Sequence, residues 1–258
     1  MLNTSKIITS SFYSPSLKLD WNYAVYLPTD FDPTINHSLL LMLHGIYGNY
    51  TNFIDDNRIN SQPILDSLEE KYHKQAIVVF VDGFNSFYIN SVFCQKMQDA
   101  IMLDLLPYLK SKFKFEYPIS IGGISMGGFG SARLSLQFPN KFKRVILLSP
   151  AVWQDKFYQP IFKTIHCFGD DKSNWNISTY RQLFPTTYLN QNNRKLEFFV
   201  RTSKYDQVVD INDVSKFVRS LTANYNNVKF KIDTFGRHNW NYWKQIITPA
   251  YEWFYEQN

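Results

Sequence analysis

The chain has 258 residues, of which 45% are hydrophobic and 19% charged, and its formal net charge is +5. This length and balance fit one large α/β domain with a sizeable core, and they exclude global disorder. The basic residues are scattered rather than gathered in a stripe, which argues against a nucleic-acid partner. The two cysteines, Cys94 and Cys167, form no Cys-x-x-Cys pair. They therefore predict buried free thiols rather than a zinc ribbon or a disulfide framework.

The N-terminal segment, residues 1–14, lacks the continuous apolar stretch that a signal peptide needs. No other stretch approaches the length of a membrane span. We therefore expect a cytoplasmic protein with no membrane partner.

Short apolar runs indicate strands, and apolar residues three or four apart indicate helices. The expected strands are residues 6–13, 21–27, 38–43, 76–81, 118–124, 145–148, 196–200 and 228–235. The expected helices are residues 63–72, 94–113, 131–138, 208–225 and 240–255, and Pro107 should kink or divide the second of them. This alternation predicts a mostly parallel central sheet with helices on both faces.

The periodicity fails between about residues 150 and 190, where aromatic residues are frequent. We interpret this segment as an irregular excursion over the edge of the sheet, within a single domain that covers residues 1–258. In open α/β sheets, ligands bind at the carboxyl ends of the strands, and the polar residues that follow the predicted strands should meet there.

The expected strand over residues 118–124 leads into the motif Gly123-Ile124-Ser125-Met126-Gly127, and a helical segment follows that motif. A strand, a sharp turn with flanking glycines and a helix place the serine at the tip of the turn. Ser125 is therefore the predicted nucleophile. A serine hydroxyl needs a base within hydrogen-bond reach and a carboxylate behind that base.

His238 follows the last predicted strand and is the predicted general base and acid. Of the other histidines, His37 and His73 lie in polar, surface-like contexts, and His166 lies in the irregular segment. His44 follows an early strand, where a His-Gly pair more often shapes an oxyanion loop than acts as a base.

Asp206 is the predicted acid, because it follows a strand and lies between Ser125 and His238 in the chain. Its rivals Asp170 and Asp171 lie in the irregular segment, with no strand to bring them to the sheet edge. Asp210 and Asp213 belong to the next helix and are expected to be solvated.

The oxyanion of an acyl-transfer intermediate needs two preorganised N–H donors. The expected donors are the backbone N–H groups of Met126 and of Ile46, which lies in the loop over residues 44–48; an ordinary glycine turn is the alternative interpretation of that loop. The aromatic residues Phe87, Tyr88, Trp153 and Trp240 are expected to line the substrate pocket, as an apolar acyl slot or a sugar platform. Simple core packing explains these four rings equally well.

Residues 43–49, 85–88, 122–128 and 236–243, together with Asp206, resemble the esterase D branch of the α/β-hydrolase superfamily. Within that branch the chain is most similar to bacterial tributyrin and acetyl esterases, from about Ser11 to the C-terminus. The Ser-Met-Gly-Gly-Phe-Gly and His-x-Trp-x-Tyr-Trp segments are the more specific parts. Phe87 stands where relatives often have Trp, and residues 153–180 match poorly, so the acyl specificity stays open.

The resemblance implies an α/β-hydrolase fold and hydrolysis of carboxylic esters through an acyl-enzyme, with Ser125, Asp206 and His238 as the triad. It also implies Ile46 and Met126 as oxyanion donors, no metal and no organic cofactor. The expected partner is a small-molecule ester, and members of the branch are often homo-oligomers. We expect a short-chain carboxylesterase that acts on acetyl to butyryl esters.

Two other enzyme activities with the same triad remain open. One is an acyltransferase, and the other is a thioesterase of the S-formylglutathione hydrolase type. A non-catalytic binding module on this fold usually lacks a triad member, whereas all three candidates are present here.

Overall fold

The structure is a computed structural model that describes residues 4–155, 157–170, 175–189 and 195–256. An eight-stranded sheet with the order β1-β2-β4-β3-β5-β6-β7-β8 runs through these residues. Its strands are β1 (Lys6–Ser14), β2 (Leu19–Leu27), β3 (Ser38–Leu43), β4 (Ala76–Val81), β5 (Ile119–Ile124), β6 (Phe142–Leu148), β7 (Glu197–Ser203) and β8 (Asn227–Asp233). β2 pairs antiparallel with both β1 and β4, and the remaining neighbours are parallel. The predicted mostly parallel sheet is confirmed.

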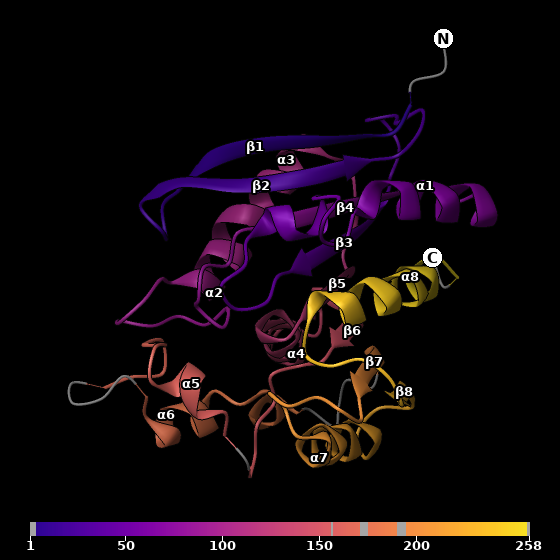
Figure 1. Ribbon diagram of the computed structural model, residues 1–258. Coiled ribbons are helices and arrows are strands. Elements are labelled where there is room, and N and C mark those ends of the chain that lie inside the picture. The colour runs from indigo at the N-terminus through magenta and orange to yellow at the C-terminus, as the bar shows by residue number, and fades with distance from the viewer. Residues whose placement is uncertain (1–3, 156, 171–174, 190–194, 257–258) are drawn as a thin grey trace.

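Helices cover both faces of the sheet (Figure 1). One face carries α2 (Met97–Asp99), the π-helical segment η2 (Ala100–Leu105), α3 (Leu106–Lys112), α4 (Met126–Gln137) and α7 (Ile211–Thr222), and the other carries α1 (Ser61–Tyr72) and α8 (Trp240–Glu256). Alternate residues of β3 enter the two cores: Leu41 packs with the first group and Leu40 with the second. A strand covered on both sides must be apolar at every position, which explains the unbroken run in its sequence.

The helix predicted over residues 94–113 begins at Met97 and changes character along its length. A π-helical segment precedes α3, and Pro107 lies in the first turn of α3. Proline lacks an N–H and clashes with the carbonyl four residues earlier in a regular α-helix. The wider π turn accommodates it, so Pro107 divides the helix as predicted.

The helix after the nucleophile starts at Met126, five residues before the predicted start at residue 131. Its first turns are rich in glycine, which has a low helix propensity, and the sequence therefore favours a later start. Packing against β5 and β6 overrides that propensity, because nearly every residue of α4 is buried.

The aromatic-rich segment after β6 contains α5 (Gln159–Phe162), α6 (Ile177–Gln182) and the 3₁₀-helix η3 (Pro185–Tyr188). α5 and α6 lie on the same side of the molecule as α2, below α4 in Figure 1. The rings of Phe168 and Tyr180 pack on Phe129 of α4, with centroids 5.8 and 5.7 Å away. This segment therefore packs as a cap on the helix that follows the nucleophile.

Three expectations about burial were wrong. Asp213 of α7 was expected to be solvated but is buried, and its Oδ1 accepts a hydrogen bond from the Asp155 N–H (3.0 Å). His37 is buried, and its Nε2 lies 2.7 Å from the Asp32 carbonyl oxygen, so a local hydrogen bond compensates its removal from water. Cys94 is half-buried rather than buried, because it lies in the loop before α2 and not in a helix, whereas Cys167 is buried as predicted.

Among the described residues, no helix combines the length and apolarity that a membrane span requires.

Candidate active site

Ser125 lies in the turn between β5 and α4 and has a left-handed φ of 55°. Its backbone is fixed at both ends, because its N–H donates to the Leu148 carbonyl (2.9 Å) and its carbonyl accepts from Ala151 N–H (3.0 Å). A non-glycine residue with positive φ is strained and persists only where the surroundings hold it. The turn thus presents the serine side chain at the edge of the sheet.

The two glycines of the Gly-x-Ser-x-Gly motif are required by close backbone packing. A Cβ on Gly123 would lie 2.3 Å from the Gly127 backbone, and one on Gly127 would lie 2.0 Å from the Leu43 carbonyl oxygen. Neither neighbour is a flexible side chain that could move aside. A side chain at either position would therefore collide with the backbone of the neighbouring strand or helix.

His238 bridges Ser125 and Asp206. Its Nε2 lies 2.8 Å from Ser125 Oγ, and its Nδ1 lies 2.7 Å from Asp206 Oδ2. A carboxylate can only accept, so Nδ1 carries the proton and Nε2 is free to accept the serine proton. The three predicted triad residues therefore come together, although they follow three different strands.

Asp206 is oriented by the backbone of its own loop. Its Oδ1 accepts hydrogen bonds from the N–H groups of Val208 and Val209, both at 2.9 Å, and its side chain has no exposed surface. These two bonds leave Oδ2 directed at His238. Of the rival acids, Asp170 instead accepts a hydrogen bond from Asn176 (2.6 Å), and Asp171 lies outside the described residues.

A buried network holds the loop that carries His238. Arg201 of β7 makes a two-pronged ion pair with Asp233 at the end of β8 (2.6 and 2.9 Å), and Tyr242 donates to the same carboxylate (2.8 Å). Burial raises the pKa of Asp233, but the hydrogen bonds from Arg201 and Tyr242 outweigh it, and the net pKa is lowered. The Tyr242 ring in turn packs against Gly236, whose φ of +79° turns the chain toward His238.

Trp243 of α8 orients the imidazole from its other side. Its ring packs edge-on against His238, with centroids 5.0 Å apart, and its indole N–H donates to Ser149 Oγ (3.2 Å). An aromatic edge that is itself hydrogen-bonded restricts rotation of the imidazole.

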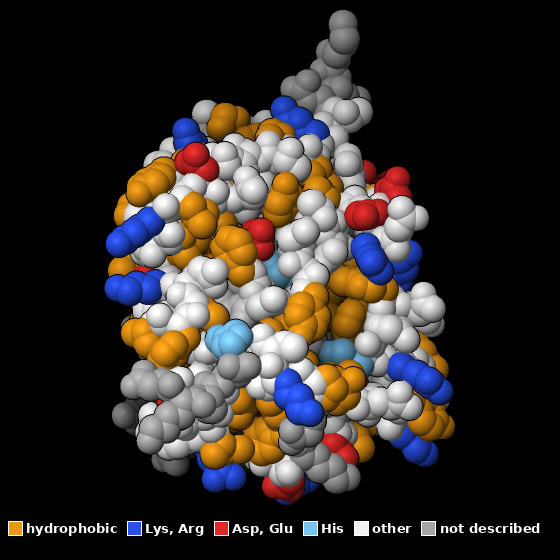
Figure 2. Space-filling view, turned by 60° about the vertical axis from the view of Figure 1, so that its left-hand side comes forward, with side chains coloured by type: hydrophobic (Ala, Val, Ile, Leu, Met, Phe, Trp, Pro, Cys, Tyr) orange, Lys and Arg blue, Asp and Glu red, His pale blue; other side chains and the backbone are white. Residues whose placement is uncertain are grey.

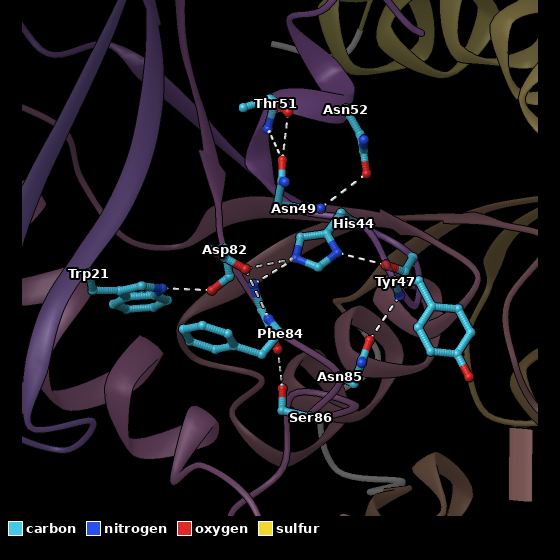
Figure 3. A network of polar contacts seen from close by, with 12 residues as sticks. Trp21, His44, Tyr47, Asn49, Thr51, Asn52, Asp82, Phe84, Asn85 and Ser86 are labelled. Carbon is cyan, nitrogen blue, oxygen red and sulfur yellow. Dashed lines mark hydrogen bonds and ion pairs between the residues drawn. The ribbon is translucent and has the colours of Figure 1, made fainter. Parts of the chain in front are cut away.

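A second histidine organises the loop after β3 (Figure 3). His44 is fully buried, and its Nε2 accepts from Gly83 N–H (2.7 Å), so its Nδ1 donates to the Gly45 carbonyl (2.6 Å). Gly48 N–H donates to the same carbonyl (3.1 Å). Asp82 Oδ1 lies 3.4 Å from His44 Nε2 and accepts from the Phe84 N–H (3.0 Å), and the Asp82 carbonyl accepts from the Trp21 indole N–H (2.6 Å; Figure 3).

The Gly45 carbonyl and the Ile46 N–H belong to one trans peptide and point in opposite directions. Because His44 and Gly48 hold the carbonyl, they also fix the direction of the Ile46 N–H. On the other side of Ile46, the side chain of Asn85 accepts from Tyr47 N–H (2.8 Å). A Cβ on Gly45 would lie 3.4 Å from the Ser125 Cβ, so this loop runs directly beside the serine.

The four aromatic residues predicted to line the pocket lie largely in the core. Phe87, Tyr88 and Trp153 have no exposed surface, and the Phe87 ring contacts Phe129, Trp153 and Phe168. Trp240 is half-buried, with the guanidinium of Arg58 over its ring at 5.2 Å. Direct contact of these four rings with a substrate stays a prediction.

Two of the described cavities adjoin the acid side of the site, whereas a larger one of about 1000 Å³ lies away from it, beside His37, Glu69 and His73. A surface hollow of about 690 Å³ is lined by Asp206, Gly236, Arg237 and Asn239 among others, and one of about 330 Å³ by Asp206, Val208 and Tyr158.

On the face in Figure 2, hydrophobic and polar side chains alternate, with lysine and arginine in small separate groups. This mixture is consistent with the scattered basic residues of the sequence.

Sequence reasoning missed the residues that hold the site in place. Asn85 accepts a hydrogen bond from a loop distant in sequence, and Arg201 and Asp233 pair with each other across β7 and β8, so no local spacing marks them. Residues 85–88 resemble the corresponding segment of the family, but nothing in their sequence indicates that Asn85 holds the Tyr47 amide.

Comparisons with known proteins agree with this geometry. Residues 14–254 match the model of the Esterase family, described as "Putative esterase". An acetyl esterase from Caldicellulosiruptor saccharolyticus is 25% identical, over 96% of this chain and 97% of the relative.

Two solved structures from Staphylococcus aureus share the fold. The fluorophosphonate-binding serine hydrolase FphF has a TM-score of 0.80 at 21% identity, covering 98% of this chain and 99% of that one. The S-formylglutathione hydrolase FrmB has a TM-score of 0.72 at 22% identity, covering 98% of this chain and 97% of that one. The predicted α/β-hydrolase fold is confirmed. Because the family match spans most of the chain, this protein belongs to the Esterase family and is a carboxylic ester hydrolase.

Proposed function

We propose that this esterase is a serine carboxylesterase that cleaves short-chain acyl esters, acetyl to butyryl, through an acyl-enzyme. Ser125 is the nucleophile, His238 the general base and then the general acid, and Asp206 the residue that holds the imidazole tautomer. The single observation that supports this assignment best is the continuous hydrogen-bonded chain from Asp206 through His238 to Ser125.

In the first step, Ser125 Oγ attacks the ester carbonyl while His238 Nε2 takes the hydroxyl proton. The imidazolium that forms is stabilised by Asp206, which keeps its negative charge. Collapse of the tetrahedral intermediate transfers the proton from Nε2 to the leaving alcohol. The acyl group stays on Ser125, and a water molecule activated by the same nitrogen then releases the acid.

The oxyanion of both intermediates would be bound by the backbone N–H groups of Ile46 and Met126. Met126 is the first residue of α4, so its N–H lies at the positive end of the helix dipole. The assignment of Ile46 is supported by the hydrogen bonds on either side of it, from His44 to the Gly45 carbonyl and from the Tyr47 N–H to Asn85. Donors held in place before the substrate arrives cost no reorganisation during the reaction.

The first experiment compares Ser125→Ala with the wild type on p-nitrophenyl acetate, propionate, butyrate and octanoate. We expect the variant to lose at least about 10⁴-fold in kcat while its melting temperature stays unchanged, because only the nucleophile is removed. A fluorophosphonate probe should label the wild type and not the variant. Turnover by Ser125→Ala at the wild-type rate would refute the mechanism, and a wild-type preference for octanoate would refute the short-chain assignment.

A thioesterase of the S-formylglutathione type is the second candidate, since FrmB shares the fold and the same triad chemistry would cleave a thioester. Comparison of kcat/KM for S-formylglutathione with that for the oxygen esters separates the two. A higher value for the thioester would replace the first proposal.

A further inference from the structure

The surface hollow of about 690 Å³ lies between the two loops that carry Asp206 and His238 and the first turns of α8. Its lining comes from residues 204–207 after β7, from residues 235–237 and 239 after β8, and from Asn241, Tyr242 and Gln245 of α8. Its volume falls in the range of small-molecule sites. The hollow is therefore large enough to hold part of a substrate beside the triad.

The hollow carries two positive charges without a counter-charge. Arg237 and Lys204 line it and are exposed, and neither forms an ion pair with any residue that the structure describes. Among the described lining residues Asp206 is the only acid, and its carboxylate already binds the N–H groups of its own loop and His238. The first turn of α8 contains no acid either, so the positive end of its dipole adds to the field. A negatively charged group is the ligand that this hollow favours.

Two exposed aromatic rings form apolar walls of the same hollow. Tyr205 is 50% exposed and Phe235 39% exposed, although large apolar side chains are usually buried. The Lys204 ammonium lies 5.7 Å from the centroid of the Tyr205 ring, and the Phe235 ring packs edge-on against Tyr242 with centroids 5.7 Å apart. Apolar walls with a few charged groups are typical of small-molecule sites. The ligand that fits therefore combines an apolar body with a negative charge.

The proposed mechanism decides which part of the ester reaches the hollow. His238 Nε2 returns the proton to the leaving alcohol, so the leaving oxygen must lie within hydrogen-bond reach of that nitrogen. The alcohol part then extends along the loop of His238, whose neighbours Arg237 and Asn239 line the hollow. The acyl group instead stays on Ser125, beside the loop of Gly45.

We propose that this hollow binds the alcohol part of the ester and selects alcohols that combine an apolar body with a carboxylate. Arg237 and Lys204 bind the carboxylate, which matches the planar fork of a guanidinium. The rings of Tyr205 and Phe235 contact the apolar body. This inference rests on the proposed ester hydrolysis and adds to it a preference for negative charge on the leaving alcohol.

The test compares three acetate esters that share the acyl group and differ in the charge of the alcohol part. They are 4-(acetoxymethyl)benzoate, the neutral 4-(acetoxymethyl)benzamide and the cationic 4-(acetoxymethyl)phenyltrimethylammonium. We expect kcat/KM of the wild type to be highest for the benzoate and about tenfold lower for the cation at low salt. The difference should shrink at about 0.5 M salt, because salt screens exposed charges.

Two variants locate the preference. Arg237→Gln removes the guanidinium, and its loss of kcat/KM should be roughly fivefold larger for the benzoate than for the benzamide. Lys244→Gln removes an exposed charge from α8 that does not line the hollow, so it should change both esters alike. An equal loss for the two esters in Arg237→Gln would overturn the proposal, as would the same selective loss in Lys244→Gln.

Turnover of p-nitrophenyl acetate, which bears no carboxylate, separates this proposal from the proposed function. A wild type that cleaves it but does not prefer the benzoate to the benzamide would keep the esterase mechanism and refute the role of the hollow. A wild type that cleaves none of these esters would refute both.

Discussion

Two histidines follow strand ends at the same edge of the sheet, and the hydrogen-bond partners of their rings differ. Both nitrogens of His44 form hydrogen bonds with backbone groups, namely the Gly45 carbonyl and the Gly83 N–H, although the Asp82 carboxylate also lies 3.4 Å from Nε2. The nitrogens of His238 contact side chains, the Ser125 hydroxyl and the Asp206 carboxylate. A backbone group cannot exchange a proton with the imidazole under these conditions, whereas a hydroxyl can. The partners of the ring, rather than its position, therefore distinguish a positioning histidine from a proton-transfer histidine.

The largest expected effect comes from removing the two rings in turn. His238→Ala should lower kcat for p-nitrophenyl acetate by about 10⁴-fold or more, since the base is lost. It should also lower the melting temperature, because the His238 side chain is only 10% exposed and its removal leaves the buried Asp206 carboxylate without its partner. His44→Ala should retain measurable activity but lower the free energy of unfolding by roughly 2–4 kcal/mol, because it leaves a cavity and two unpaired backbone groups. Steady-state kinetics measure the loss of kcat in each variant, and thermal unfolding measures the loss of stability. Equal losses of kcat in the two variants would contradict the distinction between a positioning histidine and a proton-transfer histidine.

A smaller effect is expected where a side chain holds the oxyanion loop without touching the reacting atoms. Asn85→Ala removes the acceptor of the Tyr47 N–H, so we expect roughly a tenfold loss in kcat with little change in KM, less than the loss of a donor itself. Tyr47→Phe is the matched control. It removes the hydrogen bond to Thr164 and leaves the backbone bond to Asn85, so its kcat should stay within about twofold of the wild type. A larger loss of kcat in Tyr47→Phe than in Asn85→Ala would show that the tyrosine hydroxyl, and not the hydrogen bond from the Tyr47 N–H to Asn85, holds the loop.

The sequence was sufficient for features whose spacing is local or whose order follows from the fold. Ser125 could be predicted because a tight turn between a buried strand and a helix requires glycines at fixed positions. Asp206 and His238 could be predicted because each follows a strand of a parallel sheet, and such strands end at one edge.

The features that the sequence did not reveal depend on contacts between loops. The bond from Asn85 to the Tyr47 amide joins the loops after β4 and β3, and the ion pair of Arg201 and Asp233 joins β7 and β8. Whether a ring such as Phe87 faces a pocket or the core depends on how the cap packs, and hydrophobicity alone does not decide between them.

The smallest expected effect on activity, a few-fold at most, belongs to the buried ion pair behind His238. Asp233→Asn leaves Arg201 without its counter-charge, which typically lowers the free energy of unfolding by roughly 3 kcal/mol at neutral pH. The pKa of Asp233 is lowered in the folded state, so its stabilising contribution is present above the unfolded pKa and is lost as the pH falls through the lowered folded value. The melting temperatures of wild type and variant should therefore converge below about pH 4.

Glu252→Gln provides the comparison for that measurement. Glu252 pairs with Lys71, and its pKa is lowered by the hydrogen bond from that lysine, as the pKa of Asp233 is lowered by Arg201. This pair is exposed, however, and water and salt screen it, so its removal should cost less than about 1 kcal/mol at any pH. If both substitutions cost the same at neutral pH, burial adds nothing to the pair behind His238. A constant gap between wild type and Asp233→Asn from pH 7 down to pH 3 would show that the carboxylate charge does not hold this loop.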